Sequence, residues 1–405
     1  MGRNLLWRKT LKQKLLVIKV KSKKIKVLSI FALFLSVFGP HFLFSQEKTK
    51  DSTGEITEKE EKIEKSVETL SSEEKGIIYP EPKRKRVSLV GSDHSLTKKE
   101  REKLLTPSGR AWLALALENS LPYRAYVRQK IKEMNLPPEL EFLPVVESNY
   151  KTNAVSRSGA VGMWQFMTNS MSPFLKKNSW YDERLDPWKE TDAALRKLKD
   201  NYNMFHNWSG AIAAYNCGAG AYARILKKNP GKSFWDLAAG GKLPSQTAHY
   251  LPKLIAVADV VKNAEYYGAL EVGLVDNMLD GSSYEKWDSV TIASMISLKQ
   301  LSEITGIDYE ELNFLNPSLI KKCTPAGEKY NLRVPLGYKE KVEKAIKENH
   351  LPSDALIHIV KEGDSLWAIS KKYGLTVKDL CDSNGIKEKS ILKIGQKIII
   401  PVWKD

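Results

Sequence analysis

Glu147 is the residue in this sequence whose surroundings best suit acid–base chemistry. It follows the apolar residues Leu143, Val145 and Val146, so we expect its carboxyl group to emerge from a helix that is buried on one side. A carboxylic acid held against apolar neighbours keeps its proton to a higher pH, because desolvation disfavours the charged form. Such a group can donate a proton near neutral pH. The pattern alone also fits a surface glutamate or one half of an ion pair.

Polar and aromatic residues recur in short blocks between Glu147 and Lys253. The blocks are Glu147-Ser148, Ala154-Val155-Ser156, Gly159-Ala160, Gly162-Met163-Trp164-Gln165-Phe166-Met167, Asp182-Glu183-Arg184-Leu185-Asp186-Pro187, Ala213-Ala214-Tyr215-Asn216-Cys217-Gly218 and Tyr250-Leu251-Pro252-Lys253. The acids that follow Glu147 most closely, Asp182, Glu183 and Asp186, all lie in one of these blocks. Aromatic rings in these blocks suit either a core or the apolar faces of sugars.

The three cysteines, Cys217, Cys323 and Cys381, lie far apart and form no CxxC or Cys/His pattern. We therefore expect no metal site, and no organic cofactor is indicated. Free, buried cysteines and a single disulfide with one remaining thiol both fit the sequence.

The elements that must position these residues are helical. Apolar residues recur three and four positions apart in ALRKLKDNYNMF and in TAHYLPKLIAVADVVKNAEYY, and short Gly, Pro and Asn segments separate such stretches. We predict an all-α domain over residues 105–272.

The last third of the chain contains an internal repeat with an offset of 68 residues. Leu298, Leu301, Ser302, Gly306, Leu312 and Asn316 match Leu366, Ile369, Ser370, Gly374, Leu380 and Asn384. Each copy ends in a β-rich run before a proline, and the second also begins with a strand-like run at Ile357. Two copies of one small module are therefore expected, over residues 288–338 and 356–403.

The N-terminal 45 residues resemble an export signal. A basic stretch to Lys26 precedes an apolar run, Val27 to Phe38, that is too short to span a membrane easily. A cleaved signal ending near Ser45 is favoured over an uncleaved anchor that uses Val27 to Phe44. Either way, we expect an exported protein of the cell envelope or periplasm.

Residues 46–104 are dominated by Glu, Lys, Ser and Thr, and we predict a disordered charged linker. The basic run Lys83–Arg86 within it is read as a solvated part of that linker, so no nucleic-acid partner is expected. The whole chain has 64 Lys and Arg against 48 Asp and Glu, a net charge of +16 that favours anionic partners. A hydrophobic content of 42% is sufficient for folded domains.

In their order and content, the blocks from Leu105 to Gly268 resemble the lytic transglycosylase domain, in particular the membrane-bound murein transglycosylase D type. The resemblance implies a lysozyme-like helical fold, although the family often has Leu at the position of Met163. It also implies that Glu147 protonates the oxygen between N-acetylmuramic acid (MurNAc) and N-acetylglucosamine (GlcNAc). The carboxylate then takes the proton of the sugar's own primary hydroxyl, which leaves a 1,6-anhydromuramoyl end.

The same resemblance supplies candidate substrate-binding residues. They are Ser148, Met163, Gln165, Tyr215, Asn216 and Tyr250. The Tyr215 hydroxyl is expected near Glu147 or the acetamido group of the substrate. Asn216 fits a substrate contact or the cap of a backbone turn equally well, and Tyr250 fits either a core or a groove. A Tyr-Asn block in place of a second acid favours transglycosylation over hydrolysis.

Residues 357–402 resemble a LysM domain, a module that binds GlcNAc-containing glycans. The resemblance rests on His358-x-Val360, Gly363-Asp364-Ser365-Leu366-Trp367, Tyr373-Gly374-Leu375-Thr376-Val377, Asn384 and Gly395-Gln396-Lys397-Ile398. The resemblance places the glycan groove between two loops, which carry Gly363, Asp364, Ser365 and Leu366 on one side and Asn384, Gly385 and Ile386 on the other. For Leu366 and Asn384, a purely structural role is equally compatible. The earlier copy lacks the Gly-Asp-Ser-Leu-Trp block and is read as a degenerate module.

Taken together, the sequence predicts a multidomain protein with an all-α lysozyme-like catalytic domain followed by small α+β (βααβ) modules. We expect a peptidoglycan lytic transglycosylase held on glycan strands by its LysM domain, with association to a membrane through the N-terminal segment as a further option. A lysozyme-type or chitinase-type hydrolase of the same fold and a non-catalytic peptidoglycan-binding protein are the alternatives.

Overall fold

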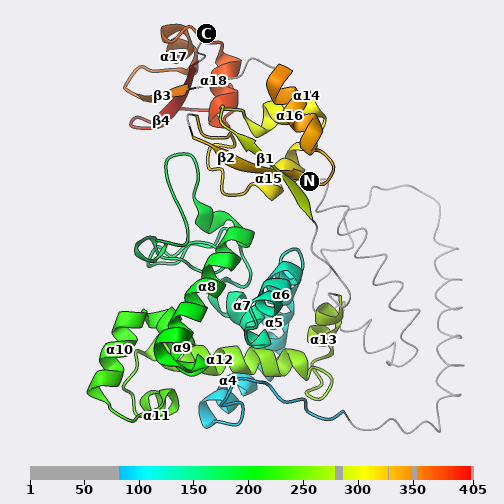
Figure 1. Ribbon diagram of the computed structural model, residues 1–405, viewed down its shortest axis with the longest axis vertical. Helices are drawn as coiled ribbons and strands as arrows, with labels where there is room; N and C mark the ends of the chain where they lie inside the picture. Colours follow the sequence, from blue (N-terminus) through cyan, green and yellow to red (C-terminus); the bar gives the residue numbers. More distant parts are fainter. Residues whose placement is uncertain (1–81, 279–285, 327, 349–353, 403–405) are drawn as a thin grey trace, which may run out of the picture. The chain divides into compact units, whose positions relative to one another are not determined.

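The computed structural model describes residues 82–278, 286–326, 328–348 and 354–402. The chain divides into two units, residues 1–84 and 85–405, and the second contains nearly all that is described here (Figure 1). The predicted export signal and most of the predicted linker, residues 1–81, lie outside the described residues. Within the described ranges, no helix combines the length and apolar character needed to cross a membrane.

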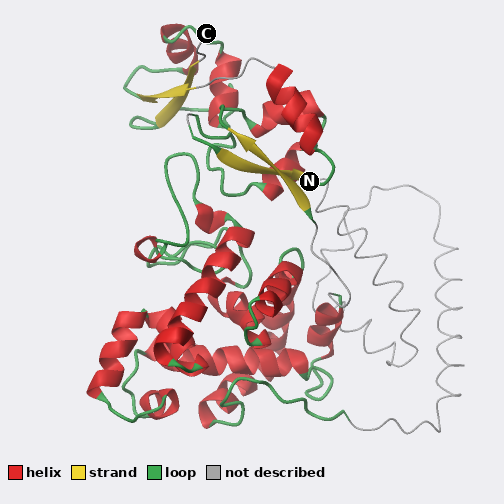
Figure 2. Ribbon diagram, viewed as in Figure 1, coloured by secondary structure: helices red, strands yellow, loops and turns green. Residues whose placement is uncertain are grey.

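Residues 95–277 form an all-helical domain, as predicted (Figure 2). Its α-helices are α4 (Ser95–Leu105), α5 (Pro107–Ser120), α6 (Arg124–Glu133), α7 (Leu143–Ser148), α8 (Pro187–Phe205), α9 (Trp208–Cys217), α10 (Ala219–Lys228), α11 (Phe234–Ala239), α12 (Ser245–Lys262) and α13 (Leu270–Asn277). Short 3-10 helices occur at η2 (Pro138–Phe142), η3 (Thr168–Ser170) and η4 (Glu183–Leu185).

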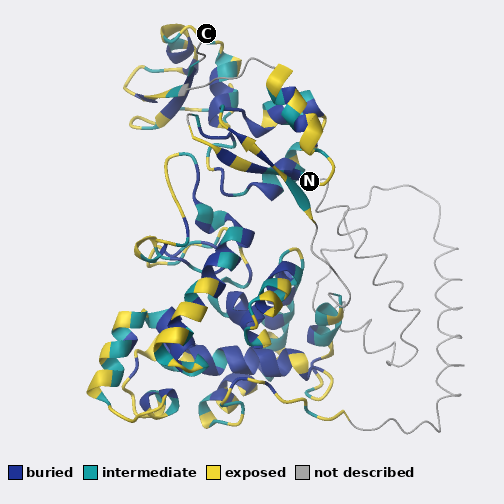
Figure 3. Cartoon of the chain, in the orientation of Figure 1, coloured by how far each residue is buried: buried dark blue, intermediate teal, exposed yellow. Residues whose placement is uncertain are grey.

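Helix α12 is the central element of this domain. Most of its side chains are buried in the main hydrophobic core, and it packs against α4, α7 and α9 (Figure 3). Helix α8 lies beside α9 and is capped at its N-terminus by Asp186, whose side chain accepts hydrogen bonds from the backbone N–H groups of Trp188 and Lys189. Helices α8, α9 and α12, together with the loop between α7 and α8, carry most of the residues that line the site described below.

The start of the folded domain corrects the predicted linker boundary. We expected disorder up to residue 104, whereas α4 covers Ser95–Leu105 and is packed against α12. Thr97 and Leu104 are buried, and Arg101 forms an ion pair with buried Asp259 at 2.6 Å. The segment is rich in charge, but one face of it, with Thr97, Glu100, Arg101 and Leu104, is buried, and its buried arginine is paired.

The two C-terminal modules each contain a two-stranded antiparallel sheet and a helix pair. In the first, β1 (Trp287–Ile292) pairs with β2 (Tyr330–Pro335) around α14 (Leu298–Thr305) and α15 (Tyr309–Leu315). In the second, β3 (Asp354–Ile359) pairs with β4 (Lys397–Val402) around α17 (Leu366–Lys372) and α18 (Val377–Asn384). Helix α16 (Lys339–Glu348) follows the first module and packs on α14 and β1. Helix α16 was not predicted, and the initial strand β1 followed only from the expected βααβ pattern, because its own sequence gave no strand signal.

An asparagine at the same point of each repeat joins its second helix to its last strand. The Asn316 side chain exchanges two hydrogen bonds with the backbone of Arg333, at 2.9 and 2.7 Å. The Asn384 side chain does the same with Ile399, at 2.7 Å for both bonds. The offset of 68 residues seen in the sequence is thus a true structural repeat.

The first module makes specific contacts with the helical domain. Arg333 of β2 pairs with the buried Asp186 carboxylate at 2.5 Å and lies over the ring of Trp188. The backbone N–H of Asp182 also donates to the carbonyl of Ser318 at 2.9 Å. The segment before α8 is therefore held by both parts of the chain.

Candidate active site

Glu147 lies near the C-terminal end of the short helix α7. Leu143, Pro144 and Val145 bury the first turn of this helix, and the chain then leaves it at Asn149 in a left-handed conformation, with φ of 55°. The apolar first turn fixes the helix in the core, so that the glutamate one turn later is half-buried at the edge of the core. The sequence pattern before Glu147 predicted this arrangement correctly.

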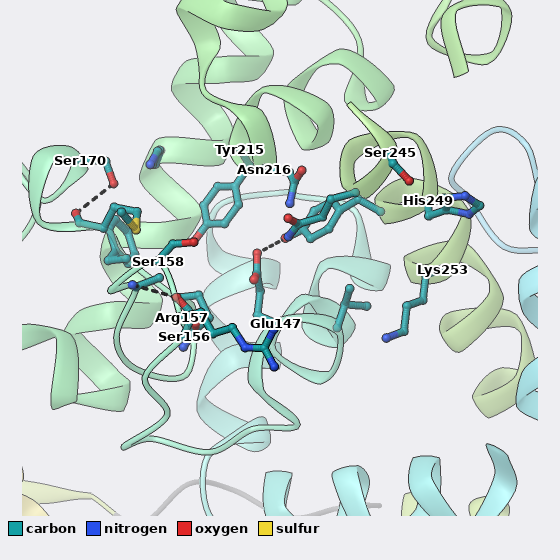
Figure 4. Close-up of a pocket in the computed structure, with 18 residues that line it drawn as sticks. Glu147, Ser156, Arg157, Ser158, Ser170, Tyr215, Asn216, Ser245, His249 and Lys253 are labelled. Carbon is teal, nitrogen blue, oxygen red and sulfur yellow. Dashed lines mark hydrogen bonds between the residues drawn. The ribbon is translucent and has the colours of Figure 1, made fainter. Parts of the chain in front are cut away.

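The Glu147 carboxyl group opens onto a pocket of about 770 Å³ (Figure 4). This volume is within the range of small-molecule and substrate pockets. The lining residues come from α7, the loop after it, α8, α9 and α12: Val146, Glu147, Ser156, Arg157, Ser158, Ala160, Gln165, Phe166, Met167, Ser170, Lys197, Tyr215, Asn216, Ser245, Gln246, His249, Tyr250 and Lys253. Segments distant in the sequence thus meet around one carboxyl group.

The Tyr250 hydroxyl of α12 donates a hydrogen bond to Glu147 Oε1. Burial raises the pKa of the Glu147 carboxyl to about 7, although this hydrogen bond and the ammonium groups of Lys197 and Lys253 act to lower it. Desolvation is the largest cause, which is the effect expected from the apolar neighbours. A group of this kind holds its proton in a substantial fraction of molecules at neutral pH and can both donate and accept it.

Besides Tyr250, three of the predicted substrate-binding residues line the pocket beside Glu147. The Tyr215 hydroxyl donates to the carbonyl of Trp164 at 2.9 Å, so it anchors the loop rather than Glu147 itself. The Gln165 amide donates to the carbonyl of Gly162 at 2.8 Å, from a backbone with φ of 55°. Asn216 accepts from the Thr247 hydroxyl at 2.8 Å. All three side chains present polar atoms at the pocket wall.

Ser148 and Met163 do not line the pocket. The Ser148 hydroxyl donates to the carbonyl of Met163 at 2.8 Å, and the Met163 side chain is fully buried. Their predicted contacts with a substrate find no support in this geometry, because one donor is already bonded and the other side chain lies in the core. Both residues instead connect α7 to the loop that forms the pocket wall.

Glu190 of α8 holds that loop from behind. Its carboxylate accepts hydrogen bonds from the backbone N–H groups of Met163 and Trp164, at 2.7 and 3.0 Å. Burial raises the pKa of Glu190 well above its ordinary value. At Gly162, where φ is 93°, an added Cβ would lie 1.9 Å from the carbonyl oxygen of Arg184 and 2.4 Å from Glu190 Oε1. Glu190 was not predicted, since an isolated glutamate on a helix gives no signal in the sequence.

The acids that follow Glu147 in the sequence serve structural roles. Asp182 pairs with Arg184 at 2.7 Å, and Glu183 pairs with Lys189 at 2.7 Å. Asp186 caps α8 and binds Arg333. None of the three is a pocket-lining residue, and Glu147 is the single carboxylate among the residues that line the pocket. In the described part of the chain, no cluster of His, Cys, Asp and Glu suited to a metal ion is found.

Four cationic or titratable side chains in the pocket wall were not predicted. They are Arg157, Lys197, His249 and Lys253. Lys253 lies one helical turn after Tyr250, so its position on the same face could have been deduced from the spacing. Lys197 and Arg157 gave no comparable signal, because charged residues on a helix or a loop usually face solvent.

Several of the predicted groove residues of the last module are part of its own fold. Leu366 lies in the hydrophobic core of the module, and the Asn384 side chain is buried and bonded to the backbone. These two residues therefore have structural roles, which was one of the two interpretations that the sequence left open. Ile386 packs partly against the same core. Gly385 ends α18 with φ of 62°.

The loop before α17 is shaped by its own hydrogen bonds. Asp364 accepts from the backbone N–H of Lys361 at 2.7 Å and lies 2.8 Å from His358 Nε2. Ser365 caps α17 by accepting from the backbone N–H of Ala368 at 3.1 Å. Gly363 has φ of 85°, in the region that favours glycine. This geometry explains the Gly-Asp-Ser sequence without reference to a ligand.

Comparisons with known protein families agree with this division of the chain. Residues 126–238 match the family described as "Transglycosylase SLT domain". Residues 286–349 match "Lytic transglycosylase MltD, LysM-like domain", and residues 358–401 match "LysM domain". The helical domain is therefore a transglycosylase SLT domain, and two LysM-type modules follow it.

Two relatives with similar sequences are lytic transglycosylases. This chain is 28% identical over 297 residues to the membrane-bound lytic murein transglycosylase D of Escherichia coli strain K12, and equally to that of Escherichia coli O6:H1. The match covers 69% of this chain and 63% of each relative, so the chain spans less than two thirds of their length. The 70 kDa soluble lytic transglycosylase of Escherichia coli aligns with 14% identity over 55% of this chain and 44% of that one, with a TM-score of 0.26, which is too low to support a conclusion. This chain is thus homologous to the D-type lytic transglycosylases in its sequence.

Proposed function

We propose that this protein is a peptidoglycan lytic transglycosylase that cleaves the β-1,4 bond between MurNAc and GlcNAc without using water. The observation that carries the proposal is Glu147, an acid with a pKa of about 7 that opens onto a substrate-sized pocket in a transglycosylase SLT domain. The homology to D-type lytic transglycosylases supports the same activity.

The reaction needs one group that first gives a proton and then takes one. The protonated Glu147 carboxyl donates its proton to the glycosidic oxygen as the bond from that oxygen to C1 of MurNAc breaks. The resulting carboxylate accepts the proton of the C6 hydroxyl of MurNAc, whose oxygen bonds to C1. The products are a GlcNAc hydroxyl and a 1,6-anhydromuramoyl end, and Glu147 is protonated again. General acid–base help of this kind contributes about 10²–10⁴-fold in rate.

The composition of the pocket favours an internal nucleophile over hydrolysis. Glycosidases that hydrolyse their substrates typically use two carboxyl groups, separated by about 5 Å in retaining enzymes and by a wider gap in inverting enzymes. Here Glu147 is the single carboxylate among the lining residues, and Glu190, the acid behind the wall, has both oxygens bonded to backbone N–H groups. The sugar's own hydroxyl therefore replaces a second acid.

The cell envelope is the location that this activity implies. We further propose that the protein is exported through its N-terminal segment and that its last module holds it on glycan strands, while the first module has a mainly structural role. The contacts of the first module with Asp186 and Trp188 support that division.

Digestion of purified sacculi tests the activity directly. The wild-type protein should release muropeptides with 1,6-anhydro ends, identified by mass spectrometry, and Glu147→Gln should release none. Reducing ends that have gained the mass of water would identify a hydrolase, whereas no release by the folded wild-type protein would refute an enzymatic role. Binding of full-length protein and of a variant lacking residues 357–405 to insoluble sacculi measures the contribution of the last module, and equal binding would refute its tethering role.

A further inference from the structure

The active-site pocket has an excess of positive charge. Arg157, Lys197 and Lys253 all belong to its lining, whereas Glu147 is the single carboxylate among the lining residues. The reaction begins with Glu147 protonated and therefore uncharged. At that moment, the pocket presents three cations and no anion of its own.

These cations come from three different elements around the substrate space. Arg157 belongs to the loop after α7 and Lys253 to α12 (Figure 4). Lys197 belongs to α8. The Lys197 Nζ lies over the rings of Phe166 and Tyr215, 5.2 Å from each ring centroid. The Lys253 Nζ lies 4.7 Å from the ring centroid of Trp112. The aromatic contacts hold both ammonium groups in place at the pocket wall.

None of the three cations forms a salt bridge with a carboxylate among the residues that the structure describes. Both lysines are half-buried, and burial lowers their pKa values more than the charges of Glu147 and, for Lys253, of Glu100 raise them. A partly desolvated cation without a paired anion is unfavourable unless a ligand supplies the opposite charge. The pocket is therefore suited to an anionic substrate group, in addition to the neutral sugar rings.

We propose that Arg157, Lys197 and Lys253 bind a carboxylate of the peptide stem on MurNAc, so that the enzyme selects strands that carry acidic stems. This inference rests on the proposed function. The stem is attached through the lactyl group of MurNAc, close to the bond that is cleaved, and its free carboxylates are the acidic groups of the strand. Stem-free strands have the lactyl carboxylate instead, and chitin has neither group.

Three forms of soluble glycan strand distinguish these sources. The first carries native stems, the second carries stems whose carboxylates have been converted to neutral amides with a carbodiimide and ammonia, and the third has no stems. For the wild-type full chain, kcat/KM for the formation of anhydro ends should fall about tenfold on the amidated strands, equivalent to about 1.4 kcal/mol, mainly through KM. Stem-free strands should also be poorer substrates than native ones.

Variants then assign the effect to two of the three cations, Lys197 and Arg157. Lys197→Met and Arg157→Gln should each lower kcat/KM on native strands and reduce the discrimination against amidated strands, and Lys197→Arg should restore it. Lys199→Met removes a charge from the exposed side of the same helix and should leave the discrimination unchanged. Because Arg157 is exposed on a loop, its variant is not expected to disturb folding.

Three results would overturn the proposal. Equal cleavage of native and amidated strands by the wild-type protein would exclude carboxylate recognition, and full activity on stem-free strands would assign the recognised carboxylate to the lactyl group. If the lysines acted only on the protonation of Glu147, their variants would shift the pH profile equally for all three substrates and leave the discrimination intact. Absence of anhydro ends from every substrate would instead refute the proposed function.

Discussion

Tyr250 and Glu147 are 103 residues apart in the sequence, and the tyrosine hydroxyl donates a hydrogen bond to the glutamate carboxyl group. The bond joins the central helix α12 to the short helix α7 at the pocket. It stabilises the charged form of the carboxyl group, whereas burial stabilises the neutral form more strongly. The proton affinity of Glu147 is therefore a balance between these two opposing effects.

The pH dependence of the reaction should report that balance. Because Glu147 must begin protonated and has a pKa of about 7, kcat/KM should be maintained below pH 7 and fall as the pH rises above it. The measurement is the initial rate of anhydro-end formation from soluble strands between pH 4 and pH 9. A rate that instead increases steadily through pH 7 would contradict the role of Glu147 as the initial acid.

Tyr250→Phe should move the descending part of this profile to higher pH. The change removes a hydrogen bond that favours the carboxylate, so the pKa of Glu147 rises further. The rate should nevertheless fall about 10- to 100-fold, since hydrogen bonds to charged groups contribute about 1.5–3 kcal/mol and this one also positions the carboxyl group. Kinetics across the same pH range test both effects, and an unchanged profile would show that the bond has no influence on the acid.

Glu147→Gln should stabilise the folded protein above neutral pH while it abolishes activity. The pKa of Glu147 is about 7 when folded against an ordinary value of 4.5, so its contribution to stability is fully present below pH 4.5 and is lost as the pH rises through 7. A neutral glutamine avoids this loss, and the gain should approach about 3 kcal/mol at pH 8. Chemical denaturation at pH 4 and at pH 8 is the measurement, and an equal effect at both pH values would contradict the linkage.

Gly162→Ala should destabilise the loop that forms the pocket wall, by more than about 3 kcal/mol. Its backbone has φ of 93°, and the added methyl group would overlap the Arg184 carbonyl and the Glu190 carboxylate. Gly159→Ala is the matched control, because Gly159 has φ of 84° with no atom within 4 Å of the added carbon. The control should lose only about 1–2 kcal/mol from backbone strain. Similar melting temperatures for the two variants would show that the close packing at Gly162 is unimportant.

Arg333→Met should destabilise the chain by about 3 kcal/mol, because it leaves the buried Asp186 carboxylate without its cation. Lys177→Met provides the comparison. Lys177 pairs with Asp182 at 3.2 Å, but 44% of its side chain is exposed, so the loss should be below about 1 kcal/mol. Urea denaturation of both variants measures the difference, and equal losses would mean that the Arg333 contact adds nothing beyond a surface ion pair.

The sequence predicted the helix before Glu147 because apolar burial has a local signature. It also predicted the repeat, because Asn316 and Asn384 occupy the same register in the two copies. It did not predict that Tyr250 contacts Glu147, since this contact depends on how α7 and α12 pack. The cations Lys197 and Arg157 were missed for a related reason, because the usual position of a charged side chain is toward solvent.

The start of α4 was missed, and β1 was expected only from the βααβ pattern of the module, because both sequences are ambiguous on their own. The residues of β1 from Trp287 to Ile292 include charged and polar side chains at positions that are exposed or half-buried, and alternation is clear only in its second half. Helix α4 is so rich in Lys and Glu that composition favoured disorder, although one face is buried against α12. In both cases, packing against a partner decided the structure.

The ion pair between Asp186 and Arg333 determines when the helical domain reaches its full stability during synthesis. The aspartate caps α8 as soon as that helix forms, but the arginine lies 147 positions later in the chain. A growing polypeptide that ends before β2 lacks the counter-charge of this acid, which caps the helix that carries Lys197 and Glu190. Full stability of the transglycosylase domain is therefore reached only after the first C-terminal module has been made and has folded against it.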